Sequence, residues 1–294
     1  METQDNFEVK DGVLIKYRGN SERVVVPDKV KMIAYCAFEN CETMKEIIIH
    51  KSVFHVERAA FSDCVNLESI VVDPDNPVYH SKGSCLIETE ADVLVAGCKT
   101  SVIPKEVGAI GPYAFFNCTG LASIEIPRSI SFIREYAFCQ CASLASIHIP
   151  YDVRKIESFA FQGNNLQSIT VDEDNINYHG VGNCLIETAY KSLIAGCQNS
   201  CVPNDRSVTS IDFAAFSGCL NLRELIIPDT ITAIEGYAFS DCPDLLSLTI
   251  PSAVKSIDMS AFNSSPNLTI ITSEGSRADY LANALKIPRQ LLAT

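Results

Sequence analysis

Two segments of the sequence carry histidine and cysteine in the same order and at the same spacing. Each has a histidine, a first cysteine five residues later and a second cysteine thirteen residues after that: His80, Cys85 and Cys98 in one, His179, Cys184 and Cys197 in the other. Thiolates and imidazoles bind zinc, and thiols also form disulfides and act as nucleophiles. The chemistry to consider is therefore a metal site or a thiol centre that occurs twice.

The spacing argues against zinc as the first interpretation. A structural zinc site usually has four nitrogen or sulfur ligands, with a pair separated by two to four residues. Each set offers three candidates and no such pair. The segments CLIET and LVAGC would instead run antiparallel in a hairpin, which mainly pairs Leu86 and Ile87 with Leu94 and Val95. We expect core or hairpin roles for these side chains, with a disulfide or a metal site as the alternatives.

Acidic stretches open the same two segments, DPDN from Asp73 and DEDN from Asp172, and call for a test of calcium binding. An EF-hand loop requires glycine at its sixth position and glutamate at its twelfth. Counting from Asp73 gives Val78 and Ser84 at these positions. We therefore expect a solvated turn.

The elements that position these residues repeat with a period of 23 residues. Residues 103–125 read IPKEVGAIGPYAFFNCTGLASIE, and residues 126–148 read IPRSISFIREYAFCQCASLASIH. The shared frame is I-P-x-x-(V/I)-x-x-I-x-x-x-A-F-x-x-C-x-x-L-x-x-I, and it occurs in eight units. A unit this short cannot bury its own apolar face, so neighbouring units must stack to form the core.

The two interruptions of this frame match each other at an offset of 99 residues, as in DPDNPVYHSKGSCLIET and DEDNINYHGVGNCLIET. We interpret them as inserted hairpin modules in a single domain spanning residues 1–294. The predicted segments are an N-terminal cap (1–25), two coils (26–72), an insert (73–102), three coils (103–171), an insert (172–201), three coils (202–272) and a C-terminal helical cap (273–294).

Alternation of apolar residues in L-x-x-I-x-I predicts a strand with one buried side, so each coil should add one short strand to a parallel sheet. The proline that follows lacks an amide donor and ends the strand. At the C-terminus, SRADYLANALKIP predicts a short helix, with Ser276 able to cap it and Asp279 near the capping-box position.

Six cysteines share one column of the frame: Cys41, Cys64, Cys118, Cys141, Cys219 and Cys242. Asn164 and Ser265 occupy the same column, which is typical of a small polar side chain that meets backbone groups inside a turn. We expect a buried structural ladder. The alternative is a disulfide between neighbouring coils, such as Cys41 with Cys64, because coils about 4.8 Å apart suit disulfide geometry.

The full pattern, L-x-x-I-x-I-P-x-x-V-x-x-I-x-x-x-A-F-x-x-C, resembles the bacterial BspA-type leucine-rich repeat over about residues 13 to 287. The insert NPVYHSKGSCLIETEADVLVAGC also resembles a hairpin module of that family, although Gly-Ser-Cys-Leu-Ile and Gly-Asn-Cys-Leu-Ile replace its Asp-Gly turn and second tyrosine. The resemblance implies a β-rich leucine-rich repeat solenoid of the α/β horseshoe class. It further implies adhesion and protein binding, with no fixed catalytic residue.

Composition excludes several other functions. The net charge of −13 argues against nucleic acid and anionic membrane surfaces, and no apolar stretch approaches the roughly 20 residues of a membrane span. The nucleotide-binding, hydrolase and metalloprotease motifs are absent, so we expect no enzyme, no cofactor and no metal. The N-terminus lacks a signal peptide, which predicts a cytoplasmic protein if Met1 is native and a secreted or surface protein if a signal was removed.

The remaining candidate is the outward face of the parallel sheet, the surface that repeat proteins commonly use. Period-two alternation assigns its two columns. The central positions form a hydroxyl-rich candidate binding face: Ser123, Glu125, Ser146, His148, Ser168 and Thr170. We expect a non-catalytic scaffold that engages a protein or glycan, in adhesion or host interaction. A thiol or metal role of the inserts and an unrecognised enzyme are the alternatives.

Overall fold

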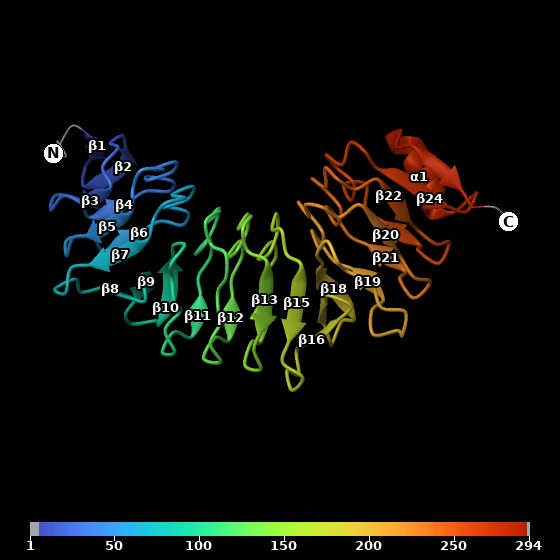
Figure 1. The fold of residues 1–294 in the computed structure, drawn as a ribbon, viewed down its shortest axis with the longest axis horizontal. Coiled ribbons are helices and arrows are strands. Elements are labelled where there is room, and N and C mark those ends of the chain that lie inside the picture. Colours follow the sequence, from blue (N-terminus) through green and yellow to red (C-terminus); the bar gives the residue numbers. More distant parts are fainter. Residues whose placement is uncertain (1–5, 293–294) are drawn as a thin grey trace. The chain divides into compact units, whose positions relative to one another are not determined.

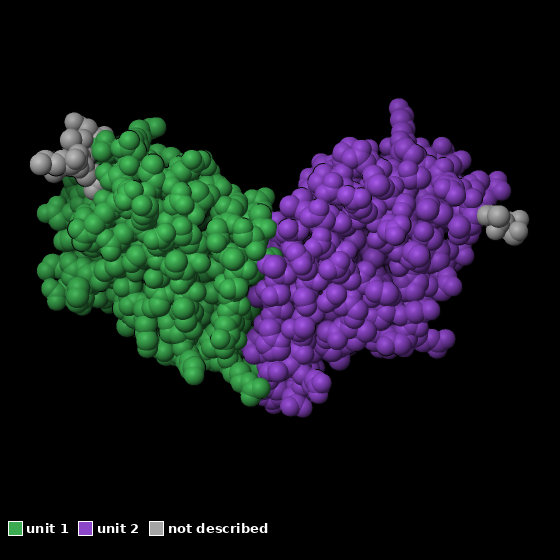
Figure 2. All heavy atoms as spheres, viewed as in Figure 1, with its two compact units in different colours: residues 1–144, 152–161 green, residues 145–151, 162–294 purple. Residues whose placement is uncertain are grey.

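The computed structural model describes residues 6–292 of the chain. It forms two compact units (Figures 1 and 2). Unit 1 comprises Met1–Leu144 and Asp152–Phe161, and unit 2 comprises Ala145–Tyr151 and Gln162–Thr294. Within each unit, consecutive coils stack with their strands parallel, which confirms the predicted solenoid.

Unit 1 contains three sheets. The first has the order β1 (Phe7–Lys10), β2 (Val13–Tyr17), β4 (Met32–Ile33), β6 (His55–Val56). The second is β3 (Arg23–Val25), β5 (Glu46–Ile49), β7 (Ser69–Val72). The third runs β8 (Tyr79–Lys82), β9 (Cys85–Glu88), β10 (Val93–Ala96), β11 (Ala109–Ile110), β12 (Phe132–Ile133), β14 (Lys155–Ile156).

Unit 2 also contains three sheets. The shortest pairs β13 (Ser146–Ile149) with β15 (Ser168–Val171). The longest runs β16 (Tyr178–Val181), β17 (Cys184–Glu187), β18 (Ser192–Ala195), β19 (Ser210–Ile211), β21 (Ala233–Ile234), β23 (Ser256–Ile257). The third runs β20 (Glu224–Ile226), β22 (Ser247–Thr249), β24 (Thr269–Thr272), β25 (Arg289–Leu291), and helix α1 spans Arg277–Leu285.

A regular coil contributes two short strands, where the sequence predicted one. The predicted strand is present, as in β5 and β7, which pair in register from Glu46 with Ser69. A second parallel ladder forms at the V-x-x-I part of the frame, where Ile33 pairs with Val56 and Ile110 pairs with Ile133. These strands have only two residues each, too short for alternation to reveal them.

The prediction of a strand at residues 123–125 was wrong. Residues 121–127 form no strand in the structure, although Leu121 and Ile126 are buried as the frame requires. On the preceding side, the neighbour of this segment is the first insert, whose Lys99 N–H bonds to Leu67 O (3.3 Å). The apolar positions are therefore kept, but the ladder bonds that define a strand are not.

Each insert folds as three antiparallel strands and then joins the coil ladder. In the first insert, Ile87 of β9 pairs with Leu94 of β10, as predicted, and β8 adds a third strand on the other side of β9. Strand β10 then pairs in parallel with β11, and β18 of the second insert does so with β19. Each insert therefore supplies a coil strand of its own.

The core consists of repeated columns of buried apolar side chains. Phenylalanines of the Ala-Phe pairs stack between coils, with ring centroids 5.1 Å apart for Phe115 and Phe138 and 5.1 Å for Phe216 and Phe239. At the C-terminus, Ser276 Oγ accepts a hydrogen bond from Asp279 N–H (3.1 Å), which confirms the predicted helix cap. No helix in residues 6–292 is long and apolar enough to cross a membrane.

Candidate binding surfaces

The six residues of the candidate binding face belong to different units. Ser123 and Glu125 are exposed in the strandless segment of unit 1. The other four lie on β13 and β15 of unit 2, where Ser146 pairs with Ser168 and His148 pairs with Thr170. The structure brings these four together on one small sheet.

His148 is the centre of this sheet face. Its Nδ1 lies 3.0 Å from Thr170 Oγ1, and its Nε2 lies 3.7 Å from Asp172 Oδ1. Both His148 and Thr170 are exposed, while the alternating residues Ile147 and Ile169 are buried. The face therefore displays a fixed imidazole, hydroxyl and carboxylate to solvent, all of which can bond to polar groups of a ligand.

Unit 1 has its own outward sheet face, on β3, β5 and β7, and the side chains on it differ in polarity from those on β13 and β15. One column pairs Arg23 with the carboxylate of Glu46 in an ion pair. The adjacent column is apolar: Val25, Ile48 and Val71. Val25 is 44% exposed, so this column offers apolar contact, whereas the β13–β15 face offers hydrogen bonds.

The cysteine column forms the predicted buried ladder. Thiols of Cys64, Cys141 and Cys242 each lie 3.1 Å from the carbonyl of a phenylalanine in the preceding coil, to which they donate a weak hydrogen bond. Ser265 Oγ makes the same bond to Phe239 O (2.6 Å). Burial raises the pKa values of Cys118 and Cys242 to about 12, so these thiols stay protonated and weakly reactive at neutral pH.

A disulfide between Cys41 and Cys64 was the alternative to the buried ladder. Both residues are free thiols in the structure. The neighbouring Cys41 thiol, together with burial, raises the pKa of Cys64. The remaining cysteines among residues 6–292 are free as well.

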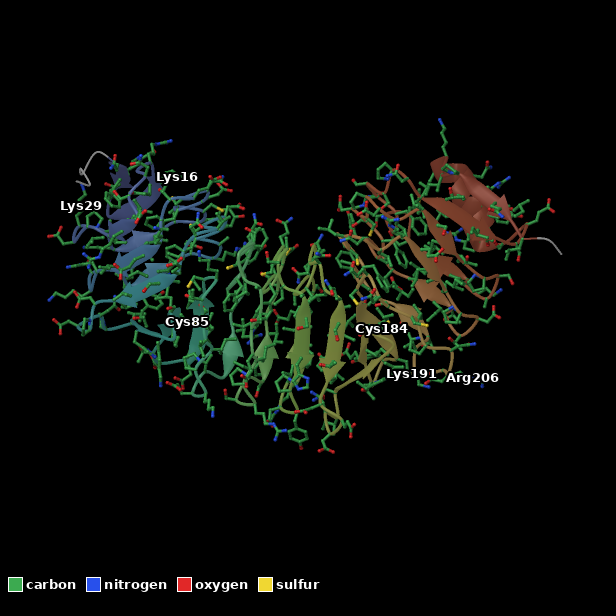
Figure 3. All side chains as sticks on the ribbon, in the orientation of Figure 1. Lys16, Lys29, Cys85, Cys184, Lys191 and Arg206 are labelled. Carbon is green, nitrogen blue, oxygen red and sulfur yellow. The ribbon has the colours of Figure 1, made fainter. Side chains whose placement is uncertain are left out.

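The duplicated histidine and cysteine sets are used within the hairpins. His80 bonds to Thr89 (Nδ1 to Oγ1, 2.9 Å) and His179 bonds to Thr188 (3.0 Å) across paired strands. Cys85 and Cys184, labelled in Figure 3, are buried, and their thiols lie 3.5 Å from the carbonyls of Gly83 and Gly182. Burial raises both thiol pKa values to about 12.

A metal centre gains no support from this geometry. In the described part of the chain, no group of three or more histidine, cysteine, aspartate or glutamate side chains is arranged to hold a metal ion. The repeated residues instead fix the hairpins, since each histidine bonds to a threonine and each first cysteine bonds to a turn.

Unit 1 also carries an aromatic stack on its surface, which the sequence patterns above did not predict. Its members each precede an Ala-Phe pair: Tyr113, Tyr136 and Phe159. Neighbouring ring centroids lie 4.7 Å apart, and Arg58 covers the Tyr113 ring at 5.3 Å while forming an ion pair with Glu135 (3.2 Å). The signal was present in PYAF, EYAF and SFAF, where a large ring recurs at one variable position of the frame.

Comparisons with known proteins agree with this architecture. A leucine rich cell surface protein from Faecalibacterium prausnitzii has 22% identity and a TM-score of 0.52, and the match covers 99% of this chain and 96% of that chain. A leucine-rich repeat protein from Eubacterium ventriosum has 21% identity and a TM-score of 0.50, with 83% and 77% covered. Both show similarity of fold. No curated protein sequence matches the chain significantly.

The family model of the BspA type leucine rich repeat region matches this chain in six copies, over residues 15–84, 96–195 and 188–285. These ranges include the coils and most of both inserts. The chain belongs to the BspA-type leucine-rich repeat family.

Proposed function

We propose that this chain is a non-catalytic scaffold that binds a protein or glycan ligand through the open faces of its parallel sheets. The observation that carries the proposal is the β13–β15 face, where exposed polar side chains stand on a two-stranded base whose other side is buried at Ile147 and Ile169. Such a base holds a recognition surface in place before binding, which reduces the entropy lost on association.

Two further observations support a binding role. The family to which the chain belongs is built from repeats, and stacked repeats create extended surfaces suited to protein interaction. The similar protein of known structure from F. prausnitzii is described as a cell surface protein, which agrees with a ligand met outside the cell. We propose a role in adhesion or host interaction on these grounds.

The test uses the full chain as bait against bacterial and host extracts and against a glycan array. After a ligand is identified, its Kd is measured for wild type and for a variant carrying both His148→Ala and Thr170→Ala. We expect at least a tenfold weaker Kd, because both exposed side chains lose their hydrogen-bonding groups. Lys255→Ala, at an exposed position of unit 2 next to β23, serves as the matched control.

The outcome separates the two parts of the proposal. A ligand whose Kd is unchanged in the double variant would place binding away from β13 and β15. If the chain converts a ligand into a product over many cycles and is itself unchanged, the non-catalytic assignment is wrong.

A further inference from the structure

Strand β25 is the edge strand of the sheet formed by β20, β22, β24 and β25 in unit 2. It follows helix α1 and lies parallel to β24, with Gln290 opposite Ile271. Every residue of β25 is exposed. A sheet edge carries backbone donors and acceptors that can pair with a further strand, so the outward backbone groups of β25 decide what this edge can bind.

The backbone groups of β25 point alternately toward β24 and away from it. Leu292 N–H donates to Thr272 O of β24 (2.9 Å), so the even-numbered residues of this segment face β24. The N–H and C=O groups of Arg289 and Leu291 therefore point away from it. Within residues 6–292, these four groups make no hydrogen bond. The edge offers two donors and two acceptors.

The features that commonly protect a sheet edge leave β25 open. Charged side chains, prolines and covering segments are the usual ones. Arg289 forms an ion pair with Asp279 of α1 and donates to the Asp279 carbonyl (3.3 Å), so its charge is held by its own helix. Pro288 precedes the strand, and the N–H that it lacks would face β24. Helix α1 packs on β23 and β24 as well as on β25, and it lies beside β24 in Figure 1.

Apolar side chains are exposed on both faces of this edge. Leu291 is 43% exposed and Leu292 is 44% exposed. Leu291 lies opposite the buried Thr272, so its side chain is on the face of the sheet that α1 covers. Successive side chains of a strand alternate between faces, which places Leu292 on the other face. A partner strand at this edge would cover apolar surface on both faces.

We propose that β25 pairs with β25 of a second copy of this chain, antiparallel and around a two-fold axis. The register follows from using all four outward groups of each copy. Arg289 then lies opposite Leu291 of the second copy, and Leu291 lies opposite Arg289 of that copy. Each of these two pairs exchanges two backbone hydrogen bonds. A two-fold axis brings the same strand of both copies together in this way.

The side chains of β25 match each other in this register, which favours a second copy over an unrelated strand. The two-fold axis passes between the Gln290 residues of the two copies, at a position where Cα atoms come to about 4.5 Å. Each side-chain amide can donate to the other. Leu292 lies opposite Pro288 of the second copy, so two exposed apolar residues cover each other. Proline fits there because this position of the ladder uses no N–H.

The contact is small, so the dimer is expected to be weak. Two short strands bury less than the roughly 1,200 Å² at which stable complexes begin, and we expect a Kd on the order of 0.1 to 1 mM. A dimer carries two copies of every ligand-binding face. It becomes more populated where a multivalent ligand holds two copies together.

Sedimentation equilibrium of the full chain tests the dimer between about 10 µM and 1 mM. We expect the average mass to rise above that of the monomer as the concentration increases. Leu291→Pro removes an outward donor from each copy and leaves the bonds to β24 intact, so we expect a Kd at least about tenfold weaker. Tyr280→Ser, which removes an exposed ring from α1, serves as the control and should leave the Kd unchanged.

The exposed residue 290 tests the two-fold axis directly. In Gln290→Glu or in Gln290→Lys, the dimer places like charges against each other, whereas a mixture of the two variants pairs opposite charges. We expect the equimolar mixture to dimerise at least about tenfold more tightly than either variant alone. The matched control is the pair Met259→Glu and Met259→Lys at an exposed position outside β25, for which mixing should have no effect.

Two results would overturn the proposal: a chain that stays monomeric up to about 1 mM, or a mixture of the residue 290 variants that dimerises no more tightly than each alone. The Leu291 amide could also become protected from hydrogen exchange only when a ligand is added to a monomeric chain. In that case the edge binds the ligand and the second copy is the wrong occupant. The scaffold proposal is tested separately, because it rests on β13 and β15.

Discussion

At the scale of single residues, the cysteine column shows how a repeated position selects its side chain. The position accepts a small group that donates to a carbonyl of the preceding coil, a bond made by Cys242 to Phe216 and by Ser265 to Phe239. The unit at residues 149–170 is one residue shorter than the 23-residue frame. Its Asn164 is buried, and the side-chain amide has no hydrogen-bond partner among the described residues. The column therefore depends on turn geometry as well as on polarity.

Replacing Cys242 separates the hydrogen bond from the volume of the side chain. Cys242→Ala loses the donor to Phe216 O, whereas Cys242→Ser keeps a donor of the kind that Ser265 uses. We expect alanine to lower the free energy of unfolding by about 1 kcal/mol more than serine does. Urea unfolding of the two variants measures the difference, and a less stable serine variant would contradict the proposed role of the bond.

Two glycines, Gly83 and Gly108, differ in whether their backbone conformation and surroundings would accept a Cβ atom. Gly83 has a φ of +59° in the two-residue loop between β8 and β9, and an added Cβ would lie 2.1 Å from Val102 O. Gly108 has no positive φ and no atom within 4 Å of an added Cβ. We expect Gly83→Ala to destabilise the chain by more than about 1 kcal/mol, and Gly108→Ala to be neutral or stabilising. Thermal melting compares them, and equal shifts would contradict this account.

At the scale of elements, the sequence predicted what depends on side-chain pattern. The Ile-Pro frame located β5, β7 and β13, and the offset of 99 residues located both inserts. The side-chain pattern could not locate the two-residue strands, because strands such as β11 are defined by backbone hydrogen bonds to neighbouring coils. The same reason applies to residues 123–125, which have the strand pattern and lack a bonded neighbour.

The surface features were less predictable than the fold. The β13–β15 face followed from alternation, since outward positions are fixed once Ile147 and Ile169 are assigned to the core. The aromatic stack depends on the left-handed turn residue of the frame, with φ of 60° at Tyr113 and 56° at Tyr136. Large side chains rarely adopt this conformation, so the ring that recurs in PYAF, EYAF and SFAF did not by itself indicate that neighbouring rings stack on the surface.

Close contact between two glycines of unit 2 allows a test of what lets neighbouring turns meet. An added Cβ at Gly218 would come within 2.7 Å of the Gly163 Cα, and Gly163 N–H donates to Ser217 O (3.0 Å). A variant with Gly163→Asp and Gly218→Asn would place side chains where the two glycines touch, which should separate the turns and break the bond to Ser217. Both positions have positive φ, which aspartate and asparagine tolerate better than other residues. We expect at least tenfold faster hydrogen exchange at residue 163, measured against unchanged exchange at Phe239 as control. Unchanged protection of the residue 163 amide from hydrogen exchange would show that the two glycines do not determine whether the turns meet.

At the scale of the whole molecule, the buried thiols link stability to pH. Burial raises the pKa values of Cys85, Cys118 and Cys184 from 9.0 to about 12. A raised pKa means that the unfolded chain loses its thiol proton first. The stabilising contribution is therefore complete below pH 9 and is lost as pH rises from about 9 to 12.

We expect the free energy of unfolding to fall by about 1 kcal/mol for each such thiol between pH 8 and pH 10. Urea unfolding at the two pH values measures the fall for wild type and for Cys85→Ser, whose hydroxyl does not titrate in this range. The serine variant should lose less stability between the two pH values. An identical loss would show that Cys85 does not contribute.

The stacking of coils has a consequence for how the molecule responds to mechanical force. Hydrogen bonds of the regular coils run to coils immediately before and after, so a pull on one end of a unit loads its outermost coil first. That coil can peel away while the next one keeps its own bonds. A 23-residue coil releases about 80 Å of chain when extended, so a tethered molecule would lengthen in small steps under tension and absorb a load gradually.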